Sequence, residues 1–153
     1  MDINHKNVEL LISKLKSITI PEGMDYQLPP MSSLTLNCIH IDYIDRMELI
    51  NHYLIERAFA NPQGTVQGGI IAACFDDTFG PLGVVTARNP ILTIDMNIQY
   101  IRPVLLDEKF YIKANVVSVS KSTIFMQAEA TNIKGKLLAK ASTNQIIKSI
   151  LNS

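Results

Sequence analysis

The segment from Asn61 to Asp76 carries residue types that could act together on a carbonyl group. Gly68 and Gly69 stand where a polar loop enters an apolar run, and Asp76 follows seven residues after Gly69. Backbone N–H groups at glycines can be approached closely, and the first N–H groups of a helix carry the positive end of its dipole. Such groups can stabilise an oxyanion. Taken alone, the two glycines could equally serve only a tight turn into the helix.

Asp76 follows the least polar run of the chain, residues 70–75. An ionised carboxylate in an apolar helix is costly unless it is paired or used in chemistry. The adjacent Asp77 diverges by about 100° around a helix, so we expect it to face solvent or cap a neighbour. Ala73 is small and leaves room for a ligand beside Asp76. The alternative role for Asp76 is a hydrogen bond to a nearby backbone or basic group.

The rise of the helix separates the two ends of this arrangement. Seven residues place Gly69 and Asp76 about 10 Å apart along the axis. Acid–base or nucleophilic work requires contact at about 3 Å, so one acyl carbon cannot touch both. If both serve one reaction, they come from two copies of the chain, and a two-fold dimer would hold two equal sites.

Hydrophobic periodicity predicts the elements that position these residues. Val8, Leu11, Ile12 and Leu15 recur at helical spacing, which predicts an amphipathic helix. Pro81 costs about 3 kcal/mol inside a helix, so it should end or kink the apolar helix. The expected elements are a helix at 5–17, a loop at 20–33, strands at 34–44 and 47–56, a buried helix at 69–80 and a short second piece at 82–87.

The last third of the chain has the pattern of consecutive strands. Between residues 93 and 102, alternation puts apolar side chains from Ile94 to Tyr100 on one face and polar ones from Thr93 to Gln99 on the other. Three further strands are expected at 109–120, 123–132 and 136–148. A buried helix beside an antiparallel sheet is an α+β fold, and these strands would curl around the helix. We expect an N-terminal extension at 1–33 and a main domain at 34–153.

Composition narrows the classes of function. The 153 residues carry 14 basic and 14 acidic side chains, and this zero net charge argues against a nucleic-acid partner. The charges within residues 1–20 argue against a signal peptide and a membrane span, so we expect a cytoplasmic protein. Cys38 and Cys74 read as buried, reduced thiols, and the scattered histidines suggest no metal site. No metal and no cofactor are expected.

The motif residues together resemble a known family. The similarity rests on Asn61, Gly64, Gln67, Gly68, Gly69, Asp76 and a strand that ends in Arg102 and Pro103. These residues are similar to the hotdog-fold thioesterases of the phenylacetyl-CoA type, the PaaI-like group, over about residues 34–148. The resemblance implies a sheet wrapped around one long helix, here with an extra N-terminal helix. It also implies hydrolysis of an acyl-CoA thioester by a homodimer or homotetramer.

The resemblance gives roles to the matching positions. The Gly68 N–H and the Asn61 side chain would polarise the thioester carbonyl. Asp76 would act as nucleophile or as general base toward water, and Thr93 would position that water. Gln67 stands where most of the family has histidine, and an amide can donate a hydrogen bond but cannot shuttle a proton. CoA is part of the substrate, and no further cofactor is implied.

Substrate contacts are expected at four positions: Gln67, Gly69, Ala73 and Arg102. Lys121, Lys136 and Lys140 could join Arg102 at the phosphates of CoA. The acyl pocket should be lined by Ile70, Ala73, Phe79 and the N-terminal segment. Two other functions stay open. A module that binds an acyl thioester without cleaving it fits the glutamine at position 67, whereas a dehydratase would need a histidine, such as His52, beside Asp76.

Overall fold

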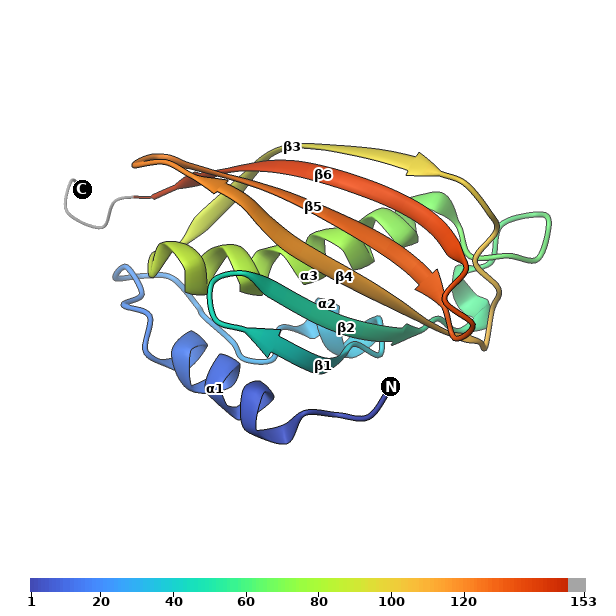
Figure 1. Cartoon of the computed structure of the whole chain (residues 1–153), viewed down its shortest axis with the longest axis horizontal. Helices are drawn as coiled ribbons and strands as arrows, with labels where there is room; N and C mark the ends of the chain where they lie inside the picture. Colours follow the sequence, from blue (N-terminus) through green and yellow to red (C-terminus); the bar gives the residue numbers. More distant parts are fainter. Residues whose placement is uncertain (149–153) are drawn as a thin grey trace.

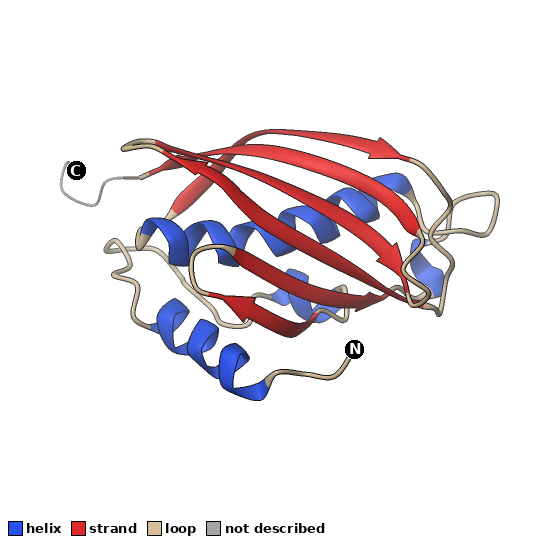
Figure 2. Ribbon diagram, in the orientation of Figure 1, coloured by secondary structure: helices blue, strands red, loops and turns tan. Residues whose placement is uncertain are grey.

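The computed structural model describes residues 1–148 as one sheet that curls over a long helix (Figures 1 and 2). The elements in chain order are α1 (His5–Lys16), α2 (Met31–Thr35), β1 (Ile39–Ile44), β2 (Glu48–Leu54), the 3-10 turn η1 (Arg57–Phe59), α3 (Gly68–Ala87), β3 (Ile91–Tyr100), β4 (Lys109–Val119), β5 (Thr123–Asn132) and β6 (Leu137–Ile147). The strands pair antiparallel in the order β1-β2-β4-β5-β6-β3. The expected α+β fold is confirmed.

The core lies between α3 and the inner face of the sheet. Phe75, Phe79 and Leu82 of α3 are fully buried, as are Phe110 and Ile124 of the strands. The helix is long and apolar enough to cross a membrane, but half of its apolar window is buried in this core. Sequential strands are neighbours except at β3, which follows α3 and pairs with β6 at the far edge of the sheet. That edge position places β3 beside the helix face that carries the candidate site.

The apolar helix does not end at Pro81. It runs as one 20-residue helix to Ala87, so the predicted break and the separate piece at 82–87 are wrong. Proline removes the N–H that would bond the carbonyl of Asp77, a cost of about 3 kcal/mol. Gly80 has no Cβ to crowd the proline ring, and burial of Phe79 and Leu82 on either side outweighs the lost bond.

A β-bulge in β3 changes which residues face the helix. Thr93 pairs with Gln145 and Asp95 with Asn144, so Ile94 is the extra, unpaired residue. Strict alternation put Thr93 and Met96 on opposite faces, but the bulge turns both toward α3. Ile94 is 56 % exposed, so its predicted place on the buried face is wrong. The bulge is what allows Thr93 to reach the helix.

The N-terminal segment packs against the rest of the fold. Leu11 and Leu15 of α1 are buried in the same core, and α1 lies against β1 and α3 (Figure 1). The Lys14 ammonium forms a 2.6 Å ion pair with Asp45 at the turn after β1. The strand expected at 34–44 is shorter than predicted, because the short helix α2 occupies its start and β1 begins at Ile39.

Candidate active site

Asp76 lies on an exposed side of α3, where it meets the bulged strand β3. The Thr93 hydroxyl donates to Asp76 Oδ1 over 2.9 Å. A hydroxyl has one proton, so Thr93 fixes the carboxylate and keeps lone pairs to accept a bond from a water molecule. Asp76 Oδ2 has no partner among the described residues, so it can accept a proton from a substrate or water.

The tip of α3 presents open backbone donors. The N–H groups of Ile70 and Ile71 both reach Gln67 O, whereas those of Gly68 and Gly69 have no acceptor among residues 1–148. The Tyr100 hydroxyl donates to Gly68 O over 2.8 Å and holds the tip against the end of β3. The Gln67 side chain is exposed and makes no capping bond. A ligand carbonyl can therefore approach two unpaired N–H groups at the positive end of the helix dipole.

Asn61 closes the loop that leads to this tip. Its Oδ1 accepts from the N–H groups of Gln63 and Thr65, at 3.0 and 3.1 Å, and its Nδ2 donates to Thr65 Oγ1 over 2.8 Å. Gly64 has a φ of +76°, which an L side chain rarely adopts. These three contacts within the chain show that Asn61 shapes the loop. The second hydrogen of its amide group is left for a substrate.

One chain does not bring the tip and the acid together. Gly68 and Asp76 are eight residues apart on one helix, so about 12 Å separates them along its axis. Thr93 contacts Asp76 in the middle of α3. Tyr100 and the loop that contains Asn61 lie at the start of the helix, beside Gly68. The two groups of residues therefore lie at separate places on one chain.

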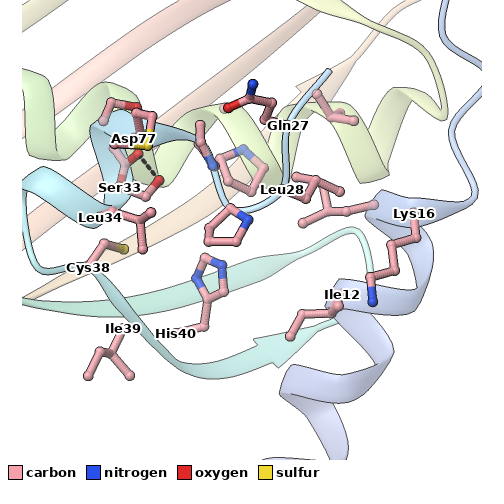
Figure 3. Close-up of a pocket in the computed structure, with 18 of the residues that line it drawn as sticks. Ile12, Lys16, Gln27, Leu28, Ser33, Leu34, Cys38, Ile39, His40 and Asp77 are labelled. Atoms are coloured by element: carbon pink, nitrogen blue, oxygen red, sulfur yellow. Dashed lines mark hydrogen bonds between the residues drawn. The ribbon is translucent and has the colours of Figure 1, made fainter. Parts of the chain in front are cut away.

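A cavity of about 1020 Å³ opens beside Asp76. Its walls come from α1, the segment with α2, β1 and the outer face of α3, and Figure 3 shows side chains converging on it from all of these. Apolar lining residues include Ile12, Leu15, Leu28, Leu34, Ile39 and Val84. The N-terminal segment contributes to these walls with Ile3, His5 and Val8 as well. Phe79 is fully buried in the core and does not line the cavity, and neither do Ile70 and Ala73.

A buried polar network forms one side of this cavity, and the sequence did not predict it. The Ser33 hydroxyl and the Tyr53 hydroxyl donate to the two oxygens of Asp77, the latter over 3.1 Å. Asp77 therefore joins α2 and β2 to α3, and it is half-buried at the cavity wall. Burial raises the pKa of Tyr53 well above its usual value, and the neighbouring Cys38 and Asp77 raise it further. Burial and then Asp77 raise the pKa of Cys38, so this half-buried residue stays a thiol.

A second groove of about 390 Å³ carries positive charge. Arg102, Lys109 and Lys136 line it together with one acidic residue, Glu108, and Arg102 Nη1 donates to Leu137 O over 2.7 Å. The groove adjoins the tip loop, because Val66 N–H donates to Val104 O over 2.9 Å. Of the lysines expected beside Arg102, Lys136 is there. Lys140 instead pairs with Glu129 over 2.9 Å, and Lys121 lies at the opposite end of β4.

Other residue types that could do chemistry lie elsewhere. His52 is buried and stacks edge-on against Tyr111, and the described contacts do not place it at Asp76. No group of three His, Cys, Asp or Glu side chains within residues 1–148 could hold a metal ion. Both cysteines are free thiols.

Comparison with known proteins decides the family. The family model described as "Thioesterase superfamily" matches residues 63–139, half of the chain. The chain belongs to the thioesterase superfamily. As a member of that superfamily, the protein is a thioester hydrolase.

Curated relatives of this thioesterase agree with that assignment. Acyl-coenzyme A thioesterase 13 of Mus musculus is 32 % identical over 95 residues, which span 61 % of this chain and 68 % of the relative. The protein of the same name from Homo sapiens is 34 % identical over 88 residues, or 56 % of this chain and 63 % of the relative. The matched region thus spans about two thirds of these relatives.

Solved structures show that the thioesterase has the hotdog fold. The PaaI protein of E. coli superposes with a TM-score of 0.77 at 14 % identity, covering 97 % of both chains. A hypothetical thioesterase of Streptococcus pneumoniae, solved with coenzyme A, gives 0.72 at 19 % identity, covering 78 % of this chain and 93 % of that one. The expected hotdog fold and the resemblance to PaaI-like thioesterases are confirmed.

Proposed function

We propose that this thioesterase hydrolyses an acyl-CoA at a site completed by two copies of the chain. The observation that carries the proposal is the Thr93–Asp76 contact at the wall of the 1020 Å³ cavity. Ligand pockets commonly measure about 300–1,000 Å³, so the cavity has room for an acyl group. The relatives named acyl-coenzyme A thioesterase and the neighbour solved with coenzyme A support CoA as the leaving group.

Asp76 acts in this proposal as the base or nucleophile. As a base, its free Oδ2 takes a proton from a water molecule that also donates to Thr93 Oγ1. The water oxygen then attacks the thioester carbon. The tetrahedral oxyanion forms bonds to the Gly68 N–H of the partner chain, and the C–S bond breaks to release CoA thiolate, which is protonated by Asp76 or solvent. As a nucleophile, Asp76 would form an anhydride that water hydrolyses.

The edge strand β3 supports pairing of two chains. Its outer edge is unpaired in the single chain, and its exposed apolar side chains include Leu92, Ile94 and Tyr100. Proteins usually cover such edges. A two-fold axis beside β3 would run the two α3 helices in opposite directions, bringing each tip toward the partner's acid. A homodimer provides this arrangement, and a dimer of dimers keeps it.

The basic groove fits the phosphates of CoA. Arg102 and Lys136, with Lys109, place three cations beside the tip loop, and guanidinium and ammonium groups bind phosphate through charge-assisted hydrogen bonds. The pantetheine arm would run from this groove to Gly68. A cytoplasmic location, where acyl-CoA is available, fits the two free cysteines.

Thiol release from acyl-CoA tests this proposal. Asp76→Asn should lower kcat by at least about 10²-fold, as expected for loss of an acid–base group. Glu129→Gln is the matched control, because this exposed carboxylate of β5 pairs with Lys140 of β6 on the face of the sheet away from α3. Full turnover by Asp76→Asn would remove Asp76 from the mechanism.

A further inference from the structure

Two histidines line the cavity beside Asp76: His5 of α1, and His40, whose Nε2 has no partner among the described residues. His40 of β1 projects into the cavity near Leu28, Leu34 and Ile39, as Figure 3 shows. Its other ring nitrogen, Nδ1, lies 2.7 Å from Asn51 Oδ1. Which nitrogen carries the proton decides whether the cavity offers a donor or an acceptor.

The proton order can be read from the buried network, starting at its charged end. The Tyr53 hydroxyl lies 3.1 Å from Asp77 Oδ2 and 3.0 Å from Cys74 O, and both of these oxygens can only accept, so the single Tyr53 proton goes to one of them. The Tyr53 oxygen can then only accept from its other neighbours. Asn51 lies 3.3 Å from it, so the side of the Asn51 amide that faces Tyr53 must be the NH₂ group.

The same order fixes the other side of the amide. The NH₂ group of Asn51 also donates to Thr78 Oγ1 over 3.2 Å, while Thr78 donates to Cys74 O over 3.0 Å. The carbonyl oxygen of Asn51 must therefore face His40 and accept from its Nδ1–H. Asn51 is fully buried, so no water competes for this oxygen.

A neutral imidazole with its proton on Nδ1 carries a lone pair on Nε2. Nε2 of His40 has no partner among the described residues, and it belongs to a ring that lines the cavity. Other polar lining groups, such as Lys16, Asp25 and Gln27, are exposed and can bond to water, whereas Ser33 and Asp77 bond to each other. His40 is thus a fixed acceptor that a hydroxyl on a ligand would satisfy.

We propose that His40 is a specificity-determining residue that selects acyl groups carrying a hydroxyl on the part that fills the cavity. This inference rests on the proposed acyl-CoA hydrolysis. His40 is half-buried, and an unsubstituted acyl chain that fills the cavity would displace water from Nε2 and leave this acceptor without a partner, which is unfavourable. The hydroxyl of the acyl group donates to Nε2, and the thioester stays at Asp76, because one cavity joins the two residues.

Matched substrates test the inference. A series of octanoyl-CoA isomers, each with one hydroxyl at a different carbon, is compared with octanoyl-CoA itself. At least one isomer should have about tenfold higher kcat/KM, as one hydrogen bond provides. His40→Phe should abolish this preference, and His52→Phe, which lies outside the cavity, should keep it. Hydrolysis without any hydroxyl preference overturns the inference alone, whereas no hydrolysis of any isomer overturns the proposed function as well.

A measurement on the unmodified protein covers the case in which His40→Phe does not fold. Imidazole ¹⁵N chemical shifts distinguish a protonated nitrogen from one with a lone pair. His40 should show a proton on Nδ1 at pH 8, and its Nε2 resonance should shift when a hydrolysis-resistant hydroxyoctanoyl-CoA thioether binds but not when the octanoyl thioether binds. A proton on Nε2, or equal shifts with both thioethers, would overturn the proposal.

Discussion

Thr93 holds Asp76 through a 2.9 Å hydrogen bond that exists because Ile94 bulges out of β3. Because of this extra residue, the side chains before the bulge point to the opposite face from the one that strict alternation predicts. The polar side chain of Thr93 therefore points toward α3. The contact leaves one carboxylate oxygen free and fixes its direction. Bulges often redirect a side chain beside an active site, and this one gives Asp76 a defined orientation.

Loss of the Thr93 hydroxyl should slow hydrolysis. Thr93→Val keeps the shape of the side chain but frees the Asp76 carboxylate to rotate, and we expect kcat to fall by about tenfold or more. Thr93→Ser keeps the donor and should retain most of the activity. Steady-state kinetics with one acyl-CoA checks both, and equal activity of the valine and serine variants would show that the contact is not used.

Neutralising the basic groove should weaken CoA recognition without slowing the chemistry. Lys109→Ala with Lys136→Ala removes two cations from the groove and should raise KM about tenfold, with kcat nearly constant. Lys121→Ala is the control at the far end of β4. The effect should disappear with an S-acyl pantetheine substrate, which lacks the nucleotide. An equal rise in KM for both substrates would place the phosphates elsewhere.

The buried network should contribute to stability through Tyr53. Tyr53→Phe leaves Asn51 and Asp77 short of one partner each in a buried setting, which costs about 1–3 kcal/mol of unfolding free energy. The Tyr111 hydroxyl makes only an exposed contact, so Tyr111→Phe should change the unfolding free energy by less than about 1 kcal/mol. Urea denaturation measures both. Equal effects would mean that the network contributes no more than a surface hydroxyl.

Acid should loosen the α1 wall of the cavity. The bond from Lys14, and then that from Tyr43, lower the pKa of Asp45 below its usual value of 3.8. A carboxyl with a depressed folded pKa stabilises the fold above the unfolded pKa, and this contribution is lost as pH falls through the folded pKa. Stability should therefore drop less between pH 5 and pH 3 in Asp45→Asn than in the unmodified protein. Parallel pH curves for the two proteins would contradict this.

Much of the fold follows from local patterns in the sequence. The helical stripe of Leu11 and Leu15 predicted α1, and the three consecutive strands expected after residue 108 are β4 to β6, with bounds within a few residues of those predicted. The predicted end of the helix at Pro81 was wrong, because the free-energy cost of one proline is small compared with the gain from burying a whole helix face. The helix α2 was not predicted, because its five residues are too few to show a helical repeat of apolar side chains.

The site was only partly predictable for a different reason. Gly68, Gly69 and Asp76 follow one another along one helix, so spacing alone could relate them. The bulge at Ile94 depends on pairing with β6, fifty residues later, and alternation cannot detect it. The network of His40, Asn51 and Asp77 joins the β1–β2 hairpin to α3, about 25 residues later in the chain. No spacing in the sequence signals such a network.

The proposed sharing of each site between two chains has a direct test by complementation. Gly68→Pro removes the N–H at the first helical position, where proline is tolerated, because Gln67 already has the extended backbone (φ −62°, ψ 139°) that a following proline requires. Asp76→Asn removes the acid instead. Each variant alone should be nearly inactive, and each is unfolded and refolded alone as a control.

When the two variants are unfolded together and refolded as a mixture, half of the dimers combine one chain of each kind. In each mixed dimer, one site receives both defects and the other receives neither, so about a quarter of unmodified activity should return. Activity near that level is the result predicted for a site shared between chains. A mixture no more active than its two components would contradict it.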